Sequence, residues 1–324
     1  MKLIVTGSIA FDYLMSFPGK FSDHFLPDKL DSISISFLVE SLIKRRGGCA
    51  ANIAYNLALL GERALLVGCA GQDFSDYKID LQKIGVDTSG VVEIKDEYTA
   101  SFFGNSDIEG NQICSFYSGA MRHAGEIELK KYIDSSDSLV IISPNDPDAM
   151  ISYSDQCKNS GCQFIFDPGQ QTLILTPDQL KKGADGAKIL ILNDYELSLF
   201  KKKTKITDED LLSLSEIVIV TLGEKGAEIR TNRGNLSVPP VKPEKILDPT
   251  GVGDGFRAGL LKGIVHNLPL EIVGRMGTLA ATYVLEADGP QSHSYTFKEF
   301  VERYCDAFGE TEKLRRLVEK NEDS

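Results

Sequence analysis

The chain has 324 residues, enough for one large α/β domain or for a domain with a subdomain, and its 42% hydrophobic and 25% charged residues are ordinary for a soluble globular protein. Its net charge of −12 argues against nucleic acid as a partner, and the basic clusters at 44–46 and 201–203 are expected to be solvated surface. Because no apolar run reaches the ~18 residues that a membrane span needs, and the N-terminus lacks the apolar core of a signal peptide, we expect a cytoplasmic protein without membrane contact.

The first predicted element is a short strand at Lys2–Thr6, and Asp12 lies just beyond its carboxyl end. Ligands bind outside that edge in open α/β sheets, so Asp12 is a candidate for hydroxyl recognition, with an ordinary turn residue as the alternative. Residues 14–46 break the βα rhythm and include the alternating run Ser32–Phe37, which predicts a strand with one solvated face. We interpret this segment as an insertion outside the main sheet.

The next stretch, Gly47–Asn52, leads into a helix and is rich in small residues that permit close packing. Asn52 offers a donor and an acceptor to a ligand hydroxyl, although a packed and satisfied Asn would also fit. Two further strands, Thr99–Gly104 and Gln112–Tyr117, are predicted to form a hairpin. Their aromatic side chains would make either a small core or a slot that stacks a flat ring.

From residue 138 onward, short β-branched runs alternate with helical segments, which is the pattern of a parallel sheet covered on both faces. The predicted strands are Leu139–Ile142, Phe164–Phe166, Ile189–Leu192 and Ile217–Val220, followed by a hairpin at 227–238 and four helices. Each strand ends in polar or turn residues. These ends should line one sheet edge together with Asp12 and the turn at 248–254.

That turn, Asp248-Pro-Thr-Gly-Val-Gly-Asp254, is the most informative stretch of the chain. Its glycines permit positive φ, and a helical pattern begins directly after them, so free N–H groups would point at one anion. A carboxylate is a poor partner for a phosphate, but it fits as a base beside a hydroxyl that receives a phosphoryl group. The alternative is a glycine-rich turn in which Asp254 caps the helix.

Three motifs, Gly47-Gly-x-x-x-Asn52, Asn193-x-x-Glu196 and the turn at 248–254, together resemble the ribokinase-like (pfkB) family of ATP-dependent small-molecule kinases over nearly the whole chain. The P-loop and dinucleotide-binding patterns are absent from the sequence. The resemblance implies an α/β fold with a mostly parallel central β-sheet flanked by helices and a small β-sheet lid. The core would comprise residues 1–13, 47–97 and 121–324, and the lid residues 14–46 and 98–120.

The resemblance also assigns the chemistry. Asp254 would be the base that takes the proton of the acceptor hydroxyl, and the amides of Gly251, Val252 and Gly253 would form the anion hole. Val252 and Gly255 stand where the family usually has Ala, and Gly255 would cost up to ~1 kcal/mol at the helix start.

For the cofactors, the resemblance implies ATP, bound near Thr221 and Gly223, and Mg²⁺, positioned through water by Asn193 and Glu196. The loop that holds a monovalent cation such as K⁺ in many family members matches Asp248, Thr250 and Gly289.

Within the family, the chain looks most like bacterial adenosine or nucleoside kinases, which transfer the γ-phosphoryl group of ATP to a nucleoside 5′-hydroxyl. The stretches that carry this similarity are Thr6–Asp12, Leu30–Val39, Ser115–Met121, Asp167–Gln171 and Asn193–Glu196. Asp12, Gly48 and Asn52 would bind the ribose hydroxyls. The residues expected around the base are the two stacking rings Phe102 and Phe116, with Ser8, Ser36, Met121 and Gln171.

Two other functions stay open at this point. A sugar kinase of the same family, ribokinase- or fructokinase-like, would also present vicinal hydroxyls to Asp12 and Asn52, but its lid would not need two aromatic faces. A non-catalytic nucleoside or nucleotide sensor belongs to another class, and the intact Asp254 counts against it. We also expect a homodimer through the lid, because a strand at Ser32–Phe37 would present an unpaired edge.

Overall fold

The computed structural model describes residues 1–25, 31–32, 34–134 and 137–322. Within these residues nine strands form one sheet, in the order β13-β12-β11-β10-β9-β8-β1-β4-β5. The strands from β11 to β5 run parallel, and the β12–β13 hairpin adds an antiparallel edge. In chain order they are β1 (Lys2–Thr6), β4 (Leu65–Gly71), β5 (Asp87–Ile94), β8 (Ser138–Ile142), β9 (Gln163–Phe166), β10 (Ala187–Asn193), β11 (Ser215–Thr221), β12 (Ala227–Thr231) and β13 (Gly234–Val238). The predicted mostly parallel central sheet is confirmed.

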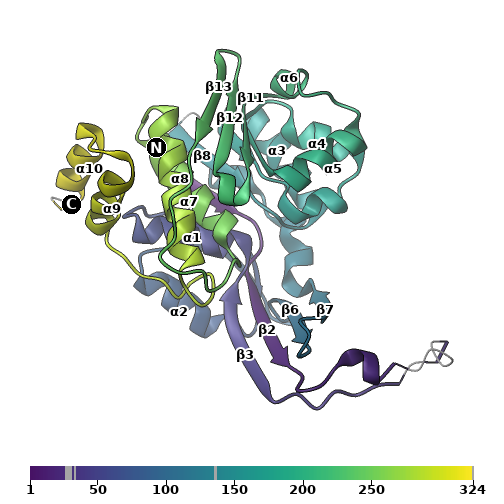
Figure 1. The fold of residues 1–324 in the computed structure, drawn as a ribbon. Helices are drawn as coiled ribbons and strands as arrows, with labels where there is room; N and C mark the ends of the chain where they lie inside the picture. Colours follow the sequence, from purple (N-terminus) through teal and green to yellow (C-terminus); the bar gives the residue numbers. More distant parts are fainter. Residues whose placement is uncertain (26–30, 33, 135–136, 323–324) are drawn as a thin grey trace.

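Helices cover both faces of this sheet (Figure 1). Those on one face are α1 (Cys49–Leu59), α2 (Ser75–Lys83), α7 (Val252–Val265), α8 (Leu270–Leu285), α9 (Phe297–Phe308) and α10 (Glu312–Glu322). Those on the other are α3 (Pro147–Asn159), α4 (Pro177–Ala184), α5 (Asp194–Thr204) and α6 (Leu211–Leu214). Strand side chains alternate between two cores, so Leu3 and Val5 of β1 pack into the first and Ile4 into the second.

Helices α7 and α8 pack unusually closely because α7 carries glycines along one side. A Cβ at Gly255 would lie 3.0 Å from the Ala280 carbonyl oxygen, and a Cβ at Gly259 would lie 2.3 Å from that of Met276. The glycine at 255, where the family usually has Ala, is therefore explained by this contact. Its conformational cost is offset by the packing that a larger residue would disrupt.

A second, four-stranded sheet projects from the core as the lid (Figure 1), with the order β3-β2-β6-β7. Its strands are β2 (Ala10–Ser16), β3 (Ser41–Gly47), β6 (Ala100–Ser106) and β7 (Gln112–Tyr117). The predicted hairpin of β6 and β7 is confirmed. The strand expected at Ser32–Phe37 is wrong: residues 34–39 have no regular structure, Ile33 lies outside the described residues, and β3 begins at Ser41. Alternation alone placed that strand, but residues 41–47 provide the backbone partner for β2.

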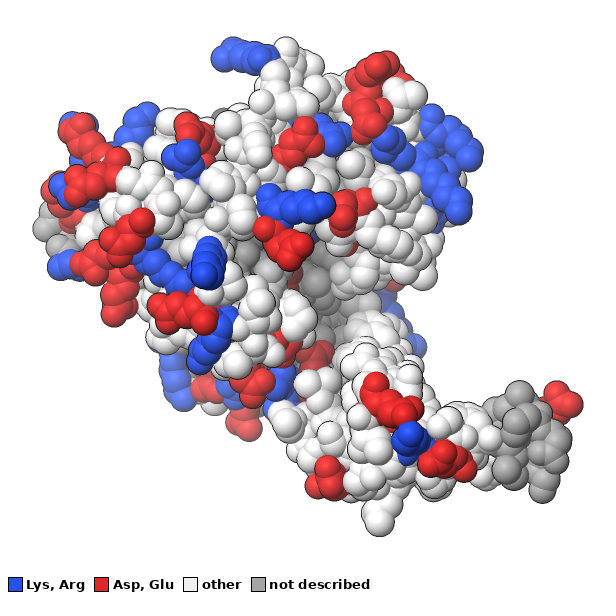
Figure 2. Space-filling view, viewed as in Figure 1, with Lys and Arg blue, Asp and Glu red and all other residues white. Residues whose placement is uncertain are grey.

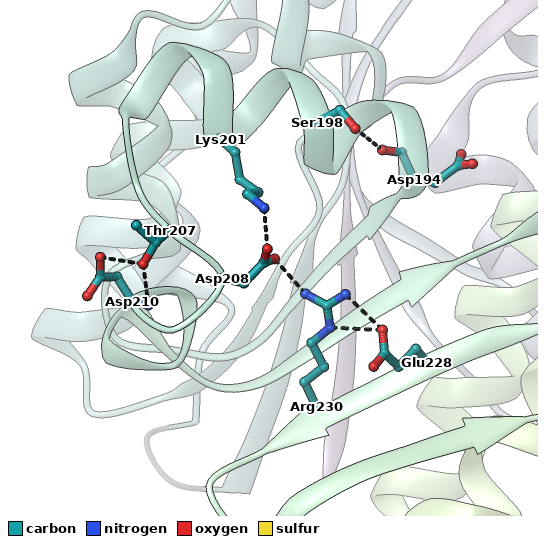
Figure 3. Close-up of polar contacts among 8 residues, drawn as sticks. All are labelled: Asp194, Ser198, Lys201, Thr207, Asp208, Asp210, Glu228 and Arg230. Atoms are coloured by element: carbon teal, nitrogen blue, oxygen red, sulfur yellow. Dashed lines mark hydrogen bonds and ion pairs between the residues drawn. The ribbon is translucent and has the colours of Figure 1, made fainter.

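An ion-pair network ties the segment after α5 to the β12–β13 hairpin (Figure 3). Asp208 accepts from Lys201 and, at 2.9 Å, from Arg230, whose guanidinium also binds Glu228 at 2.8 Å. Partly exposed pairs of this kind contribute about 1 kcal/mol or less each. Their main effect is to fix the loop beside the edge of the sheet.

None of the described helices is both long enough and apolar enough to cross a membrane.

Candidate active site

The ends of the central strands and one face of the lid enclose a cleft of about 1580 Å³. Figure 2 shows the surface hollowed where the lid meets the core. The cleft is lined by most of the predicted site residues: Ser8, Asp12, Gly48, Asn52, Phe102, Phe116, Met121, Gln171, Asn193, Glu196, Thr221, Gly223, Thr250, Gly251, Val252, Gly253 and Asp254. Ser36 is exposed on the irregular segment before β3 and is not part of this lining. Asp248 and Gly289 are also outside it.

The glycine turn (residues 248–254) leads directly into α7. Gly251 caps α7 with a φ of 79°, a left-handed conformation that strongly favours glycine. The amide of Val252 is 3.3 Å from the carbonyl oxygen of Pro249, so it is partly engaged inside the turn. The amides of Gly253 and the residue after it belong to the first helical turn, where N–H groups have no acceptor within the helix. With the helix dipole, they favour a phosphate at this end of the cleft.

Asp254 lies in the first turn of α7 and lines the cleft. Its Oδ2 accepts a hydrogen bond of 2.8 Å from Nδ2 of Asn52. Burial raises the pKa of Asp254 to about 7, although the Asn52 hydrogen bond and the nearby Arg257 guanidinium oppose the rise. A carboxylate with a near-neutral pKa is well suited to take a proton from a hydroxyl and to release it afterwards.

A series of hydrogen bonds fixes the orientation of Asn52. Its Oδ1 accepts from Nε2 of Gln291 at 2.8 Å, and the same nitrogen donates to the hydroxyl of Tyr77. The Tyr77 hydroxyl in turn donates to the Gly47 carbonyl at 3.0 Å. Because Gln291 holds the oxygen of Asn52, the amide nitrogen faces Asp254. Gln291 was not predicted as a site residue, since a loop glutamine 239 positions from Asn52 gives no signal of this contact in the sequence.

Arg257 and Asp167 form a buried ion pair beside the glycine turn. Nη2 of Arg257 is 2.6 Å from Oδ1 of Asp167, Nε binds the other carboxylate oxygen, and Nη1 donates at 2.9 Å to the Gly253 carbonyl. The two side chains are 8% and 1% exposed. The pair ties the turn to the end of β9. Arg257 was not predicted as a site residue, although an arginine between the apolar residues Phe256 and Ala258 of a helix was a usable signal in the sequence.

Four side chains lie in one row across the cleft-facing side of the lid. Asp12 on β2 is opposite Arg45 on β3 and Phe102 on β6. Phe102 is in turn opposite Phe116 on β7. Directly opposed residues share a face, so the lid presents a carboxylate and two aromatic rings to the cleft together. Burial raises the pKa of Asp12 to about 6, against the opposing effect of Arg45.

The segment around Gly48 comes very close to the end of β1. Gly48 has a φ of 94°, and a Cβ there would lie 2.6 Å from the Ser8 carbonyl oxygen. The Ser8 hydroxyl accepts from the Cys49 amide at 2.9 Å. Across the cleft, Gln171 donates a hydrogen bond from Nε2 to the Asn145 carbonyl at 2.7 Å. Its amide oxygen is therefore the atom that can accept a hydrogen bond from a ligand.

Asn193 and Glu196 cap α5 reciprocally. Oδ1 of Asn193 accepts from the Glu196 amide at 2.7 Å, and Oε2 of Glu196 accepts from the Asn193 amide at 2.8 Å. The spacing of this motif therefore has a structural role of its own, as a capping box. Burial and the neighbouring Asp167 raise the pKa of Glu196. Thr221 ends β11, and Gly223 follows it at the same sheet edge.

This corner of the cleft carries excess negative charge. Asp167, Glu196 and Asp254 surround one guanidinium, that of Arg257. A polyphosphate would be repelled here unless a divalent cation offset the charge. Among the described residues, no three His, Cys, Asp or Glu side chains are grouped to hold a metal ion by themselves. The corner thus fits Mg²⁺ that is shared with phosphates and water, which is how this ion is usually held.

The loop expected to hold a monovalent cation contains a lid side chain instead. Oδ2 of Asp248 is 2.5 Å from Nη1 of Arg45, and its Oδ1 accepts from the Thr250 amide at 2.8 Å. The Arg45 side chain also runs beside Gly289, where a Cβ would be 3.2 Å from its Cδ. These residues do not fit a bound potassium ion. The expectation that Arg45 is solvated surface is wrong, since its side chain is 17% exposed.

A carboxylate beside a helix N-terminus that binds phosphate can take the proton of a hydroxyl to which the phosphoryl group is transferred, and Asp254 lies in that position. The fold and the cleft thus define a phosphotransferase with an alcohol group as acceptor. The chain belongs to the pfkB family of carbohydrate kinases, whose family model matches residues 26–296.

Known proteins of this fold are similar over almost the whole chain. The nucleoside kinase of Methanocaldococcus jannaschii is 29% identical over 304 residues, which cover 93% of this chain and 96% of that protein. A structure of Burkholderia thailandensis nucleoside kinase in complex with inosine has a TM-score of 0.82 and 35% identity, covering 96% of this chain and 99% of that one. The same enzyme in complex with ADP-inosine has a TM-score of 0.80 and 36% identity, with 96% and 97% covered.

Proposed function

We propose that the protein is an ATP-dependent nucleoside kinase that phosphorylates the 5′-hydroxyl. The observation that carries the proposal is the row of Asp12, Phe102 and Phe116 on the cleft face of the lid, across from Asn52 and Asp254. A carboxylate suits ribose hydroxyls, and paired rings suit a purine or pyrimidine face. The nucleoside kinases to which the chain is similar support the same assignment.

The proposed reaction is a displacement at the γ-phosphorus of ATP. Asp254 takes the proton from the 5′-hydroxyl while that oxygen attacks the γ-phosphorus of ATP. The bond from the γ-phosphorus to the bridging oxygen breaks, and ADP leaves with the electron pair. The amides at the start of α7 stabilise the charge on the transferred group. Asn52, held by Gln291, orients the base.

We propose that Asn193 and Glu196 would hold Mg²⁺, through water, in the corner of the cleft that would receive the nucleotide phosphates. When bound, the ion neutralises phosphate charge in a corner that is otherwise acidic. Thr221 and Gly223 would contact the nucleotide at the same sheet edge.

The acceptor is tested by following ADP release with nucleosides and with free sugars. We expect nucleosides to be preferred, and we expect Phe102→Ala to raise KM for nucleosides about tenfold, because base stacking contributes roughly 1–3 kcal/mol. Ribose turnover should hardly change in this variant. Phe103→Ala is the matched control, since Phe103 is the next residue of β6 but stacks on Tyr13, with ring centroids 4.9 Å apart, on the other face of the lid.

Equal effects of Phe102→Ala on nucleosides and sugars would favour a sugar kinase, whose lid needs no aromatic stack. The absence of ADP release with every acceptor, together with measurable nucleoside binding, would favour a non-catalytic sensor instead. The alternatives thus predict different results in the same assay.

We further propose a homodimer that forms through the lid. With the alternating strand at Ser32–Phe37 excluded, the support comes from the sheet edges β3 and β7 and from exposed apolar side chains near them, Leu42 at 62% and Ile113 at 41%. Sedimentation equilibrium should give twice the chain mass, and Leu42→Glu should shift the protein towards monomer. A monomer at all concentrations in the unaltered protein would refute the homodimer.

The cytoplasmic location expected from the sequence stays a prediction.

A further inference from the structure

Arg45 joins the lid to two core loops that adjoin the catalytic centre. On β3, its guanidinium contacts Oδ2 of Asp248 and Oδ1 of Asp288, each at 2.5 Å. Asp248 opens the glycine turn, and Asp288 precedes Gly289 in the loop after α8. The Asp248 side chain is 14% exposed, so the first contact is well shielded, whereas Asp288 is 74% exposed. The shielded pair therefore matters more for the position of the turn.

Both oxygens of the Asp248 carboxylate already have a partner inside the protein. One carboxylate oxygen binds Arg45, and the other accepts from the Thr250 amide. The aliphatic part of Arg45 occupies the space next to Gly289. A second cation between these loops would both displace the side chain and be repelled by its permanent charge.

We propose that the guanidinium of Arg45 is the resident cation of the glycine turn, in the place where a potassium ion would otherwise bind. It neutralises Asp248 and holds the turn in the conformation that points the amides of α7 into the cleft. As a planar fork with two carboxylate partners, it also fixes the lid strand relative to the turn. Arg45 is thus a positioning residue, and phosphotransfer does not depend on added monovalent cations.

The first test uses the unaltered protein. Turnover is measured with K⁺ and with tetramethylammonium at equal ionic strength, so that screening is constant. We expect kcat to differ by less than about twofold, because the site is already filled. Activation of more than about fivefold by K⁺ would overturn the proposal without recourse to any variant.

The second test uses Arg45→Ala, which removes the guanidinium and leaves its position open to a free cation. We expect kcat to fall about tenfold with a smaller change in KM, and either K⁺ or free guanidinium to restore part of the loss. Arg45→Lys should retain more activity than Arg45→Ala, since it keeps the charge but not the fork. The matched control is Arg46→Ala, which removes the neighbouring arginine of β3, paired with Asp80, and should show no response to either cation.

Thermal melting without substrate gives a readout that is independent of the proposed acceptor. K⁺ should raise the melting temperature of Arg45→Ala but not that of the unaltered protein or Arg46→Ala. A folded Arg45→Ala variant that responds to neither cation, in turnover or in melting, would overturn the assignment. Failure of nucleoside turnover with the expected melting pattern would contradict the proposed function alone.

Discussion

Asp254→Asn is expected to lower kcat about 10³-fold while the dissociation constant of the nucleoside changes by less than about threefold. The reason is that an amide cannot accept the proton of the 5′-hydroxyl, yet it has nearly the shape of the carboxylate and can still bond to Asn52. The measurements are steady-state ADP release and calorimetric titration with nucleoside. A kcat close to that of the unaltered protein would remove Asp254 from the role of base.

The pH profile tests the same role without a variant. Because burial raises the pKa of Asp254 to about 7, the ionised base is lost as the pH falls through neutrality, and kcat/KM should decline below about pH 7. The residual activity of Asp254→Asn should lack this decline.

The stability of the fold should depend on pH in the opposite direction from kcat/KM: the Asp254 contribution should fall as the pH rises. A folded-state pKa above the ordinary aspartate value of 3.8 means that the protonated form is favoured in the native protein, so the stabilisation present at low pH is lost as the pH rises towards 7. Asp254→Asn removes this titration, and it should melt at the same or a higher temperature above pH 7. This outcome also shows that lost turnover is not a folding defect.

Arg257→Met is expected to lower the free energy of unfolding by about 3–5 kcal/mol. Removing the guanidinium leaves Asp167 charged at 1% exposure without its partner, and the Gly253 carbonyl loses a donor. Turnover should fall as well, because Gly253 belongs to the turn that we propose binds the phosphoryl group. Denaturant unfolding and ADP release measure the two consequences separately.

An exposed ion pair serves as the control for Arg257→Met. Arg315 contacts Glu310 with the two side chains 59% and 68% exposed, so Arg315→Met should cost less than about 1 kcal/mol. The double variant Arg257→Met/Asp167→Leu should recover most of the stability, since an apolar pair leaves no unpaired charge. Its turnover should remain low. A cost of about 1 kcal/mol or less for Arg257→Met alone would contradict the role of the buried pair.

Local chemistry explains why the glycine turn and most of the cleft could be predicted. Positive φ at Gly251, free amides at a helix start and polar residues after parallel strands all depend on near neighbours in the chain. The motif at Asn193 and Glu196 was likewise visible, and its capping geometry follows from its spacing. Prediction failed at Ser32–Phe37, where alternation is a weak criterion because a strand also requires a partner with unpaired hydrogen-bonding groups.

The sequence by itself therefore determined the class of fold and the glycine turn that opens α7, with Asp254, the proposed base, in its first helical turn. Only the tertiary structure decided what holds these parts in place. Asp248 meets Arg45 across 203 positions, Asn52 meets Gln291 across 239, and Asp167 meets Arg257 across 90. Such contacts depend on how the lid, the sheet edge and α7 pack together, and no periodicity or local propensity encodes them. That is why Arg45, which the sequence alone placed on the solvated surface, contacts Asp248 of the glycine turn in the folded protein.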